Sequence, residues 1–324
     1  MSSKPCCARC PSPHDREVSE PSYAAGFDPA AIPAEVRARL RGLRLGTRLN
    51  SRSAGIGQHT GHSRGAGLEF AQYRAYGQGD EPRQVDWKLF ARSDRYFVRD
   101  ALRESPLTIW LLLDASASME QADAARPHYR KLDAACALAA CVAEIALQQG
   151  DSFGLAALSG AGMQVLMPGG GRRHRDQLWL ELRALRHGGT LPAETAVRPL
   201  WERIAPGTLV LTLSDDFDDT LVAFAERLAA AGRDVLSIGL LTAEERDFPF
   251  LGGHRFHEPE SGAELHLEAR GGADEFIGRF QAARAGLSRQ LAAAGIRHCD
   301  HYLDEALDAP LQRLFRAGGW AAPN

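Results

Sequence analysis

An aspartate and two serines directly follow a run of apolar residues. The segment LTIWLLL, residues 107–113, leads into Asp114, Ser116 and Ser118, which are separated by single alanines. The small alanines allow a tight loop in which one carboxylate and two hydroxyl groups converge. Such hard oxygen atoms suit Mg²⁺, Mn²⁺ or Ca²⁺ and suit zinc or copper poorly. These residue types and their spacing therefore predict a divalent-cation site, with Mg²⁺ as the first candidate.

Because Mg²⁺ prefers about six oxygen ligands, further oxygens must come from other loops. Thr190 offers a hydroxyl group between two expected helices, although neighbouring Thr195 is also available. The apolar segment 208–213 leads, after one serine, to Asp215 and Asp216. Asp215 is the better candidate because it lies nearer the end of the strand. The predicted metal-site residues are Asp114, Ser116, Ser118, Thr190 and Asp215.

The elements that would position these residues alternate between strands and helices after residue 106. Continuous apolar segments such as LTIWLLL and TLVLTL are typical of parallel strands covered by helices on both faces. Ligands of such sheets bind at the carboxyl ends of the strands, where the candidate residues lie. We therefore expect an α/β domain with a doubly wound, mostly parallel sheet. The expected strands are 107–113, 152–158, 164–167, 208–213, 234–241 and 296–303, and the expected helices are 129–149, 175–186, 192–204, 221–231, 274–294 and 307–316.

The first third of the chain has a different composition. The N-terminal residues are rich in Pro, Ser and Cys, which is typical of a disordered tail, and three of the six cysteines lie within the first ten residues. A short helix near 33–43 and short alternating segments at 68–76 and 95–102 are separated by loops rich in Gly and Ser. The expected domains are a disordered tail over 1–25, a small β-rich subdomain over 26–105 and the α/β domain over 106–324.

The order of the candidate residues resembles the metal-ion-dependent adhesion site of von Willebrand factor A domains. That site has the pattern Asp-x-Ser-x-Ser, a distant Thr and a later Asp after an apolar strand, and the five candidates match it residue by residue. The resemblance implies a von Willebrand A-like fold whose metal keeps one coordination position for an Asp or Glu of a partner protein. It therefore implies a binding site and not a catalytic one.

A second motif precedes this domain. The segment from Gly79 to Trp87 reads Gly-Asp-Glu-Pro-Arg-Gln-Val-Asp-Trp, and its charged side chains are expected to pair around Trp87. It resembles the Gly-Asp-x-x-Arg-x-Ile-Asp-Trp signature of domain-of-unknown-function family 58, whose members carry a von Willebrand A-like domain. The similarity extends over roughly residues 40–316. Many members have transmembrane helices near the N-terminus, a feature that this sequence does not show.

Proteins of this kind are commonly associated with MoxR-type AAA+ ATPases. The resemblance implies an adaptor that acts with such an ATPase in the assembly or maturation of protein complexes. The chain itself lacks the Gly-x-x-x-x-Gly-Lys-Ser/Thr phosphate-binding loop, so we do not expect it to hydrolyse ATP alone.

Composition and charge narrow the classes of function and cellular location that fit the sequence. The formal net charge is −3, and residues 1–105 carry 17 Lys/Arg against 12 Asp/Glu, an excess too small to indicate nucleic-acid binding. The longest strongly apolar stretch, residues 107–113, is much shorter than the roughly 20 residues that span a bilayer. The N-terminus has no apolar core of a signal peptide. We expect a cytoplasmic protein without membrane insertion and without a nucleic-acid partner.

Three other interpretations of the Asp-Ser-Ser trio remain open. Asp114 and Ser116 could cap the N-terminus of a helix. A Mg²⁺-dependent phosphoesterase could use the same oxygens, although Ser116 replaces the second aspartate of an Asp-x-Asp phosphatase, and no second set of metal ligands and no general base is evident. Finally, the metal site could be vestigial, and the fold could bind partners through other surfaces.

Overall fold

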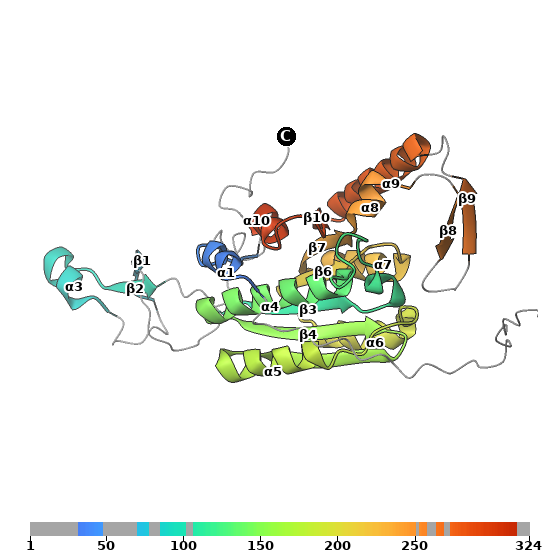
Figure 1. The fold of residues 1–324 in the computed structure, drawn as a ribbon. Coiled ribbons are helices and arrows are strands. Elements are labelled where there is room, and N and C mark those ends of the chain that lie inside the picture. The colour runs from blue at the N-terminus through green and yellow to red at the C-terminus, as the bar shows by residue number, and fades with distance from the viewer. Residues whose placement is uncertain are drawn as a thin grey trace, which may run out of the picture.

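The computed structural model describes residues 32–47, 70–77, 85–101, 106–250, 253–257, 264–268 and 273–315. The expected tail over 1–25, its cysteines and residues 78–84 of the second motif lie outside these residues. A six-stranded sheet forms the centre of the molecule (Figure 1). Its strands are β3 (Thr108–Asp114), β4 (Ser152–Ser159), β5 (Gly162–Gly169), β6 (Leu209–Ser214), β7 (Asp234–Leu241) and β10 (Arg297–Tyr302).

The strand order of this sheet is β10-β7-β6-β3-β4-β5. Strands β10, β7, β6, β3 and β4 are parallel, and β5 pairs with β4 in the antiparallel direction at one edge. The chain winds outward from β3 in one direction and from β6 in the other, so the order reverses between these two central strands. The expectation of a doubly wound, mostly parallel sheet is confirmed. Ligand sites of such sheets form at this reversal, beyond the carboxyl ends of the strands.

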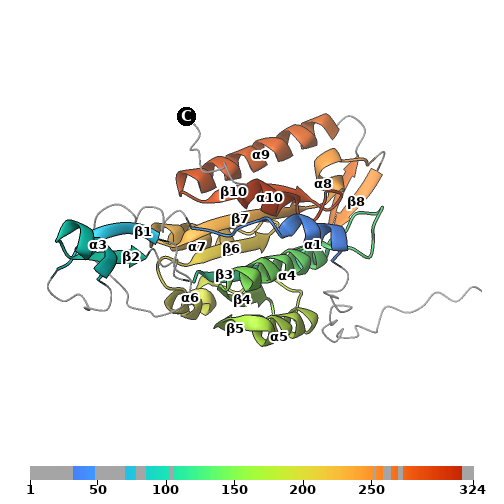
Figure 2. The ribbon, with the colours of Figure 1, turned by 90° about the vertical axis from the view of Figure 1, so that its left-hand side faces the viewer.

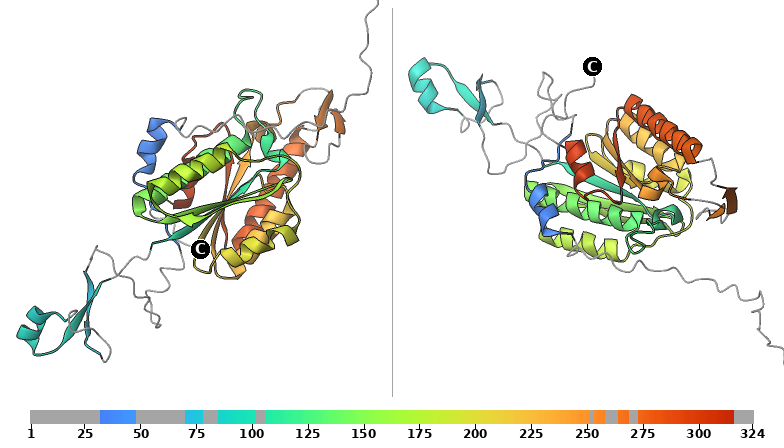
Figure 3. Two further views of the ribbon diagram at one scale, coloured as in Figure 1. Left: turned by 90° about the horizontal axis from the view of Figure 1, so that it is seen from below. Right: turned by 45° about the horizontal axis from the view of Figure 1, so that its top comes forward.

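Helices cover both faces of the sheet (Figures 2 and 3). Because successive strand residues point to opposite faces, Leu111 of β3 packs into one apolar layer and Leu112 into the other. The first layer contains α1 (Ala34–Leu40), α4 (Lys131–Gln149), α5 (Gly171–Arg183) and α10 (Ala309–Phe315). The second contains α6 (Glu194–Arg203), α7 (Asp219–Ala230) and α9 (Ala273–Ala293).

Helix α4 supplies much of the first layer. Among the described residues it is the one helix that is long and apolar enough to cross a membrane by length and composition. However, 72% of its most apolar 18-residue segment is buried inside the protein. This segment packs against the sheet and α5 (Figure 1). Its many alanines allow close approach to the strands, and a helix that is apolar on most sides is typical of a protein core.

Helix α1 belongs to the core of the large sheet although it precedes the small subdomain along the chain. Val36 and Leu40 are buried in the first apolar layer beside α4 (Figure 2). The guanidinium of Arg39 binds both carboxylate oxygens of Asp308, with Nε to Oδ2 at 2.7 Å. The structure therefore places α1 with the α/β core, whereas the sequence grouped it with residues 26–105.

Two small antiparallel sheets accompany the large one. β1 (Phe70–Ala75) pairs with β2 (Phe97–Ala101), and β8 (Gly253–His257) pairs with β9 (Glu264–Glu268). The first pair and the short helix α3 (Trp87–Ser93) form a separate small unit in Figure 1. This agrees with the expected β-rich character of the segment, while the domain boundaries at residues 25 and 105 stay predictions.

Several short elements were missing from the sequence prediction. They are α3, α8 (Ala243–Asp247), the 3-10 helix η3 (Ala117–Glu120) and the β8–β9 pair. A helix of one or two turns shows too little periodicity to be recognised and depends on its cap. Asp86 caps α3 by accepting hydrogen bonds from the backbone of Lys88 and Leu89, and Thr242 caps α8.

Candidate metal centre

The loop after β3 brings the Asp-Ser-Ser trio together. The Asp114 side chain is buried, and its Oδ1 accepts a hydrogen bond from the Ser116 backbone N–H at 2.9 Å. The hydroxyl oxygens of Ser116 and Ser118 lie 3.1 Å apart. Two adjacent oxygens of an octahedral Mg²⁺ complex with bonds near 2.1 Å are also about 3 Å apart. The two hydroxyls are hydrogen-bonded to each other, and their spacing is also compatible with two neighbouring ligands of one Mg²⁺ ion.

The neighbouring strand β6 ends beside this loop. Ser214 donates a hydrogen bond to Asp114 Oδ2 at 2.6 Å and accepts one from the Asp216 backbone at 3.0 Å. Asp215 follows directly and is 1% exposed. The two carboxylates predicted from separate parts of the chain, Asp114 and Asp215, thus lie at the ends of the two central strands, which are paired in parallel.

Two negative charges are concentrated at this end of the sheet. Burial and, to a smaller extent, the nearby charge of Asp215 together raise the pKa of Asp114 to about 6, against the hydrogen bonds from Ser214 and Ser116. A cation bound here would offset both effects, since an opposite charge favours the ionised carboxylate. The electrostatics of the site therefore fit a metal ion.

Backbone hydrogen bonds hold the loop that contains Thr190 against the Asp-Ser-Ser loop. Gly188 N–H donates to Ala115 at 2.8 Å, and Ala117 N–H donates to Gly189 at 2.8 Å. Thr190 is the next residue and is exposed. The alternative candidate, Thr195, lies within α6. The structure thus places Thr190, and not Thr195, directly after the backbone that contacts the predicted site; its role as a ligand stays a prediction.

A buried lysine, which the sequence did not indicate, lies next to Asp215. The Lys131 side chain is fully buried, and its Nζ lies 2.7 Å from Glu245 Oε1, 2.9 Å from Gln121 Oε1 and 3.4 Å from Asp215 Oδ2. A basic residue at the first position of a helix gives no local signal of such a contact. Its partners lie 10, 84 and 114 residues away along the chain.

A cluster of charged groups around Arg284 lies on the other side of Asp215. Arg284 of α9 donates a hydrogen bond from Nη1 to the Asp215 carbonyl at 2.9 Å, and its guanidinium also binds Asp300 and lies 3.6 Å from Asp216. His298 Nε2 donates a hydrogen bond to Asp300 Oδ1 at 3.0 Å. Nothing in their spacing along the chain indicates that these residues lie beside Asp215.

The pKa values of the two carboxyl groups of this cluster are shifted in opposite directions. Burial raises the pKa of Asp216 to about 6 despite the charges of His298 and Arg284. For Asp300 burial acts in the same direction, but hydrogen bonds from His298 and Arg284 outweigh it and lower the pKa to about 2. Asp300 is therefore the ionised partner of Arg284 at neutral pH.

The helix-cap interpretation of the trio does not describe the observed contacts of Ser116. Ser116 is the N-cap residue of η3, but its side chain makes no capping hydrogen bond. Its hydroxyl faces Ser118 instead. Asp114 precedes the cap position, and its carboxylate orders the loop through the backbone of Ser116. The hydroxyl groups are thus not used to cap the helix.

Comparison with known protein families identifies the family to which the chain belongs. Residues 72–286 match the family described as "Protein of unknown function DUF58", which is well over half of the sequence. This is a DUF58 protein. The matched region contains the second motif and all five predicted metal-site residues.

Relatives of this DUF58 protein include an uncharacterized protein of Mycobacterium tuberculosis, strain ATCC 25618 / H37Rv. The two are 26% identical over 268 residues, which cover 81% of this chain and 83% of the relative. An uncharacterized protein of Mycobacterium bovis matches with the same identity and coverage. Both relatives are described only as uncharacterized proteins.

Solved structures with a similar arrangement include an aerotolerance-related membrane protein from Bacteroides fragilis, which shares 13% identity at a TM-score of 0.41. The match covers 64% of this chain and 95% of that one. The SpRpn10 VWA domain shares 11% identity at a TM-score of 0.37, over 68% of this chain and all of that domain. At these TM-scores neither similarity indicates what the site of this chain does.

The part of the DUF58 signature that the structure describes has a structural role. Asp86 Oδ1 accepts hydrogen bonds from Lys88 N at 2.9 Å and Leu89 N at 3.1 Å and so begins α3. Trp87 is 58% exposed and contacts Phe90 and Tyr96 edge-on. The charged pairing expected around it includes Arg83, which lies outside the described residues, so that pairing stays a prediction. The exposure of Trp87 follows from its position as the first residue of a helix on a small two-stranded sheet.

The donor set of the predicted site is chemically restricted. Within the described ranges, no three His, Cys, Asp or Glu side chains gather as a metal-binding group. The strand-end site instead combines one or two carboxylates with hydroxyl oxygens. Such a set fits a hard cation that keeps several water ligands, as Mg²⁺ does, and does not fit zinc.

Proposed function

We propose that this DUF58 protein is a metal-dependent protein-interaction module. The observation that carries the proposal is the 3.1 Å spacing of the Ser116 and Ser118 hydroxyls beside buried Asp114, at the reversal of strand order. In this proposal Asp114, Ser116, Ser118 and Thr190 hold Mg²⁺, or Mn²⁺ or Ca²⁺, directly or through water. Asp215 lies behind them, and its charge is shared with the buried ammonium group of Lys131.

The residues of the chain would prepare the site for a partner. Ser214 and the Ser116 backbone orient the Asp114 carboxylate, and the hydrogen bonds of Gly188 and Gly189 hold the Thr190 loop in place. When bound, the metal supplies a Lewis-acidic position for an Asp or Glu side chain of another protein. Because these groups are fixed by the ends of core strands, little reorganisation is needed on binding.

The partner class follows from the family resemblance. We propose that the protein works as a cytoplasmic adaptor with a MoxR-type AAA+ ATPase in the assembly or maturation of protein complexes. The absence of a phosphate-binding loop from the sequence supports a division of labour in which the ATPase supplies the energy. The protein itself inserts into no membrane and binds no nucleic acid in this proposal.

The proposal assigns no catalytic activity to the chain. A Mg²⁺-dependent phosphoesterase at the same strand ends would need a second metal or a general base near the reacting phosphate. The buried carboxylates of Asp114 and Asp215 already have partners in Ser214 and Lys131. A screen for phosphatase activity with Mg²⁺ distinguishes the two functions, and activity that disappears in Asp114→Ala would favour the enzyme.

Titration calorimetry with Mn²⁺ and Mg²⁺ tests the metal site. We expect the wild-type protein to bind one ion and Asp114→Ala to lose that binding. Asp176→Ala is the matched control, because Asp176 is a half-exposed aspartate on α5 and pairs with Arg175. Absence of binding by the wild type, or equal binding by Asp114→Ala, would overturn the proposed function. Proteins that co-purify with the tagged chain in Mg²⁺ but not in chelator would identify the partner.

A further inference from the structure

The strand-end site already contains a cation that belongs to the protein. Lys131 is the first residue of α4, and its side chain is 0% exposed. The amino end of a helix carries partial positive charge, so an ammonium group is unfavourable there. Burial of the charge adds a further cost. Both costs must be offset by contacts that the protein makes at this position.

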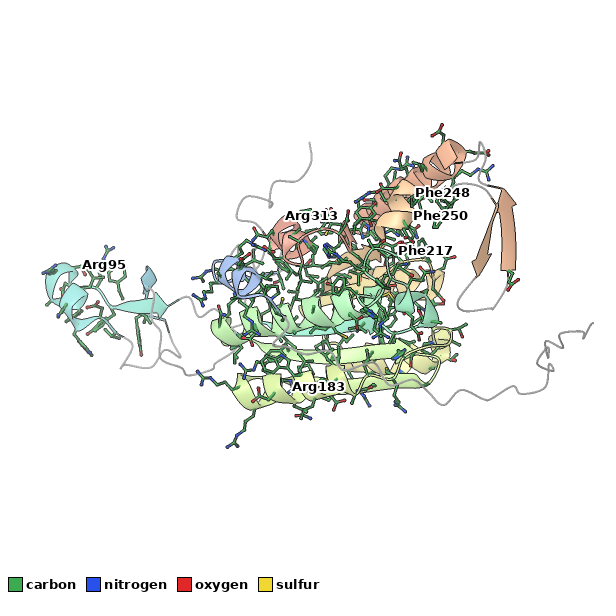
Figure 4. All side chains as sticks on the ribbon, in the orientation of Figure 1. Arg95, Arg183, Phe217, Phe248, Phe250 and Arg313 are labelled. Atoms are coloured by element: carbon green, nitrogen blue, oxygen red, sulfur yellow. The ribbon has the colours of Figure 1, made fainter. Side chains whose placement is uncertain are left out.

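Three oxygen atoms and an aromatic ring supply those contacts. Lys131 Nζ reaches Gln121 in the loop after β3, Asp215 after β6 and Glu245 in α8, which follows β7. The Phe217 ring lies 5.2 Å from Nζ and is itself 53% exposed. Phe217 is one of the side chains labelled in Figure 4. One ammonium group thus connects loops from three strands and is covered by a ring on the surface.

Lys131 also determines what charge a metal would meet. The Asp215 carboxylate is engaged at both oxygens: Oδ2 lies 3.4 Å from Lys131, and Oδ1 accepts from the Phe217 backbone at 3.3 Å. Lys131 is shared between Asp215 and the nearer carboxylate of Glu245, at 3.4 and 2.7 Å, so it offsets part of the charge of Asp215. The Ser214 and Ser116 groups that donate hydrogen bonds to Asp114 are uncharged, so its negative charge is not offset in this way.

We infer that Lys131 is a positioning residue that lowers the affinity of the site for a divalent cation by offsetting part of the negative charge of Asp215. This inference rests on the proposed function. A metal with a single uncompensated carboxylate binds weakly, because affinity for hard cations rises with the charge of the ligand set. A carboxylate from a partner then supplies the missing negative charge, so metal and partner strengthen each other's binding.

Calorimetry with Mn²⁺ alone tests this inference. Lys131→Met keeps the length of the side chain and removes its charge, and we expect it to bind Mn²⁺ on the order of tenfold more tightly than the wild type. Arg39→Met is the matched control: it also removes one positive charge from a buried aspartate, Asp308, in a different part of the fold. We expect the control to bind Mn²⁺ as the wild type does.

Thermal unfolding provides a second readout. In chelator, Lys131→Met should melt at a lower temperature than the wild type, because Asp215 and Glu245 lose their buried cation. Excess Mn²⁺ should raise its melting temperature by more than it raises that of the wild type. At one ligand concentration, an ion that binds more tightly stabilises the folded state more. An equal Mn²⁺-induced increase in both proteins would contradict the inference.

A single and a double variant test the inference if Lys131→Met does not fold. Asp215→Asn should bind Mn²⁺ more weakly than the wild type, because Lys131 is then less compensated. Adding Lys131→Met to Asp215→Asn removes the buried charge together with its partner, which proteins tolerate better, and should restore affinity. A double variant that binds no more tightly than Asp215→Asn would overturn the inference.

The outcomes separate this inference from the proposed function. If wild type and Lys131→Met bind Mn²⁺ equally, and Asp114→Ala does not bind, the metal site stands and the role of Lys131 is wrong. If neither wild type nor Lys131→Met binds Mn²⁺, both the metal site and the inference are overturned.

Discussion

At the scale of single residues, Asp114 organises the candidate site. Its two carboxylate oxygens accept hydrogen bonds from different loops, one from the Ser116 backbone and one from the Ser214 hydroxyl. A buried carboxylate is retained at a strand end only when such donors compensate for the loss of water. Ser214 therefore contributes to the site by orienting the Asp114 carboxylate. Its position in the sequence identifies it only as the residue before Asp215.

Ser214→Ala should destabilise the protein. The substitution leaves Asp114 Oδ2 without its 2.6 Å donor, and an unsatisfied buried acceptor costs about 1–3 kcal/mol. Chemical denaturation measures the difference. Ser93→Ala is the control, because the exposed Ser93 hydroxyl bonds only to the carbonyl of Leu89 in its own helix, and should change stability by less than about 0.5 kcal/mol. Equal stability of Ser214→Ala and the wild type would contradict this account.

At the scale of elements, the site depends on the close approach of two loops. Gly160, in the turn between β4 and β5, donates a backbone hydrogen bond to Gly188 at 2.8 Å. A Cβ atom at Gly160 would lie 2.9 Å from the Gly189 Cα and 3.0 Å from the Gly188 carbonyl oxygen. Only glycine permits this approach, and through it the turn holds the Thr190 loop against the loop after β3.

Gly160→Ala should displace the Thr190 loop. The added methyl group meets backbone atoms, which cannot rotate away, so we expect a loss of about 1–3 kcal/mol in stability and weaker Mn²⁺ binding. The control is Gly42→Ala, whose Cβ would have no atom within 4 Å. Denaturation and calorimetry on both variants test the prediction. Wild-type stability and metal affinity in Gly160→Ala would show that the loop contact does not support the site.

At the scale of the whole molecule, opposite faces of the sheet meet at Asp215. Its carboxylate pairs with Lys131 of α4 from one helical layer, and its carbonyl accepts from Arg284 of α9 in the other. Arg284 also binds Asp300 on the edge strand β10. The candidate site is thus tied to both helical layers and to the edge of the sheet, so its ionisation states contribute to global stability.

Stability at acid pH should depend on Asp300. Its pKa is lowered from 3.8 to about 2, so the ionised form stabilises the folded state above about pH 4, and this contribution of about 2 kcal/mol is lost as the pH falls from 4 to 2. Asp300→Asn should therefore lose less stability over that interval than the wild type. Denaturation at pH 7, 4 and 2.5 measures this, and parallel losses in both proteins would contradict the assignment.

Much of the architecture could be predicted because it is encoded locally. Apolar runs such as residues 107–113 form buried strands wherever helices flank them, and their alternation with helical segments specifies a parallel sheet. The Asp-x-Ser-x-Ser spacing after such a strand places its oxygens at a carboxyl end by chain geometry alone. The proximity of Asp114 and Asp215 follows in turn from the adjacency of β3 and β6, which is common in this class of sheet.

The sequence by itself therefore determined the α/β class, most strands and helices, and the five candidate metal-site residues. Only the tertiary structure decided that Lys131 and Arg284 enclose Asp215, that Gly160 supports the Thr190 loop and that α1 joins the large core. These contacts join residues 84 and 69 positions apart for Lys131 and Arg284. Periodicity and spacing report only on neighbours along the chain, whereas packing brings distant charged groups into one buried volume, where they must compensate one another.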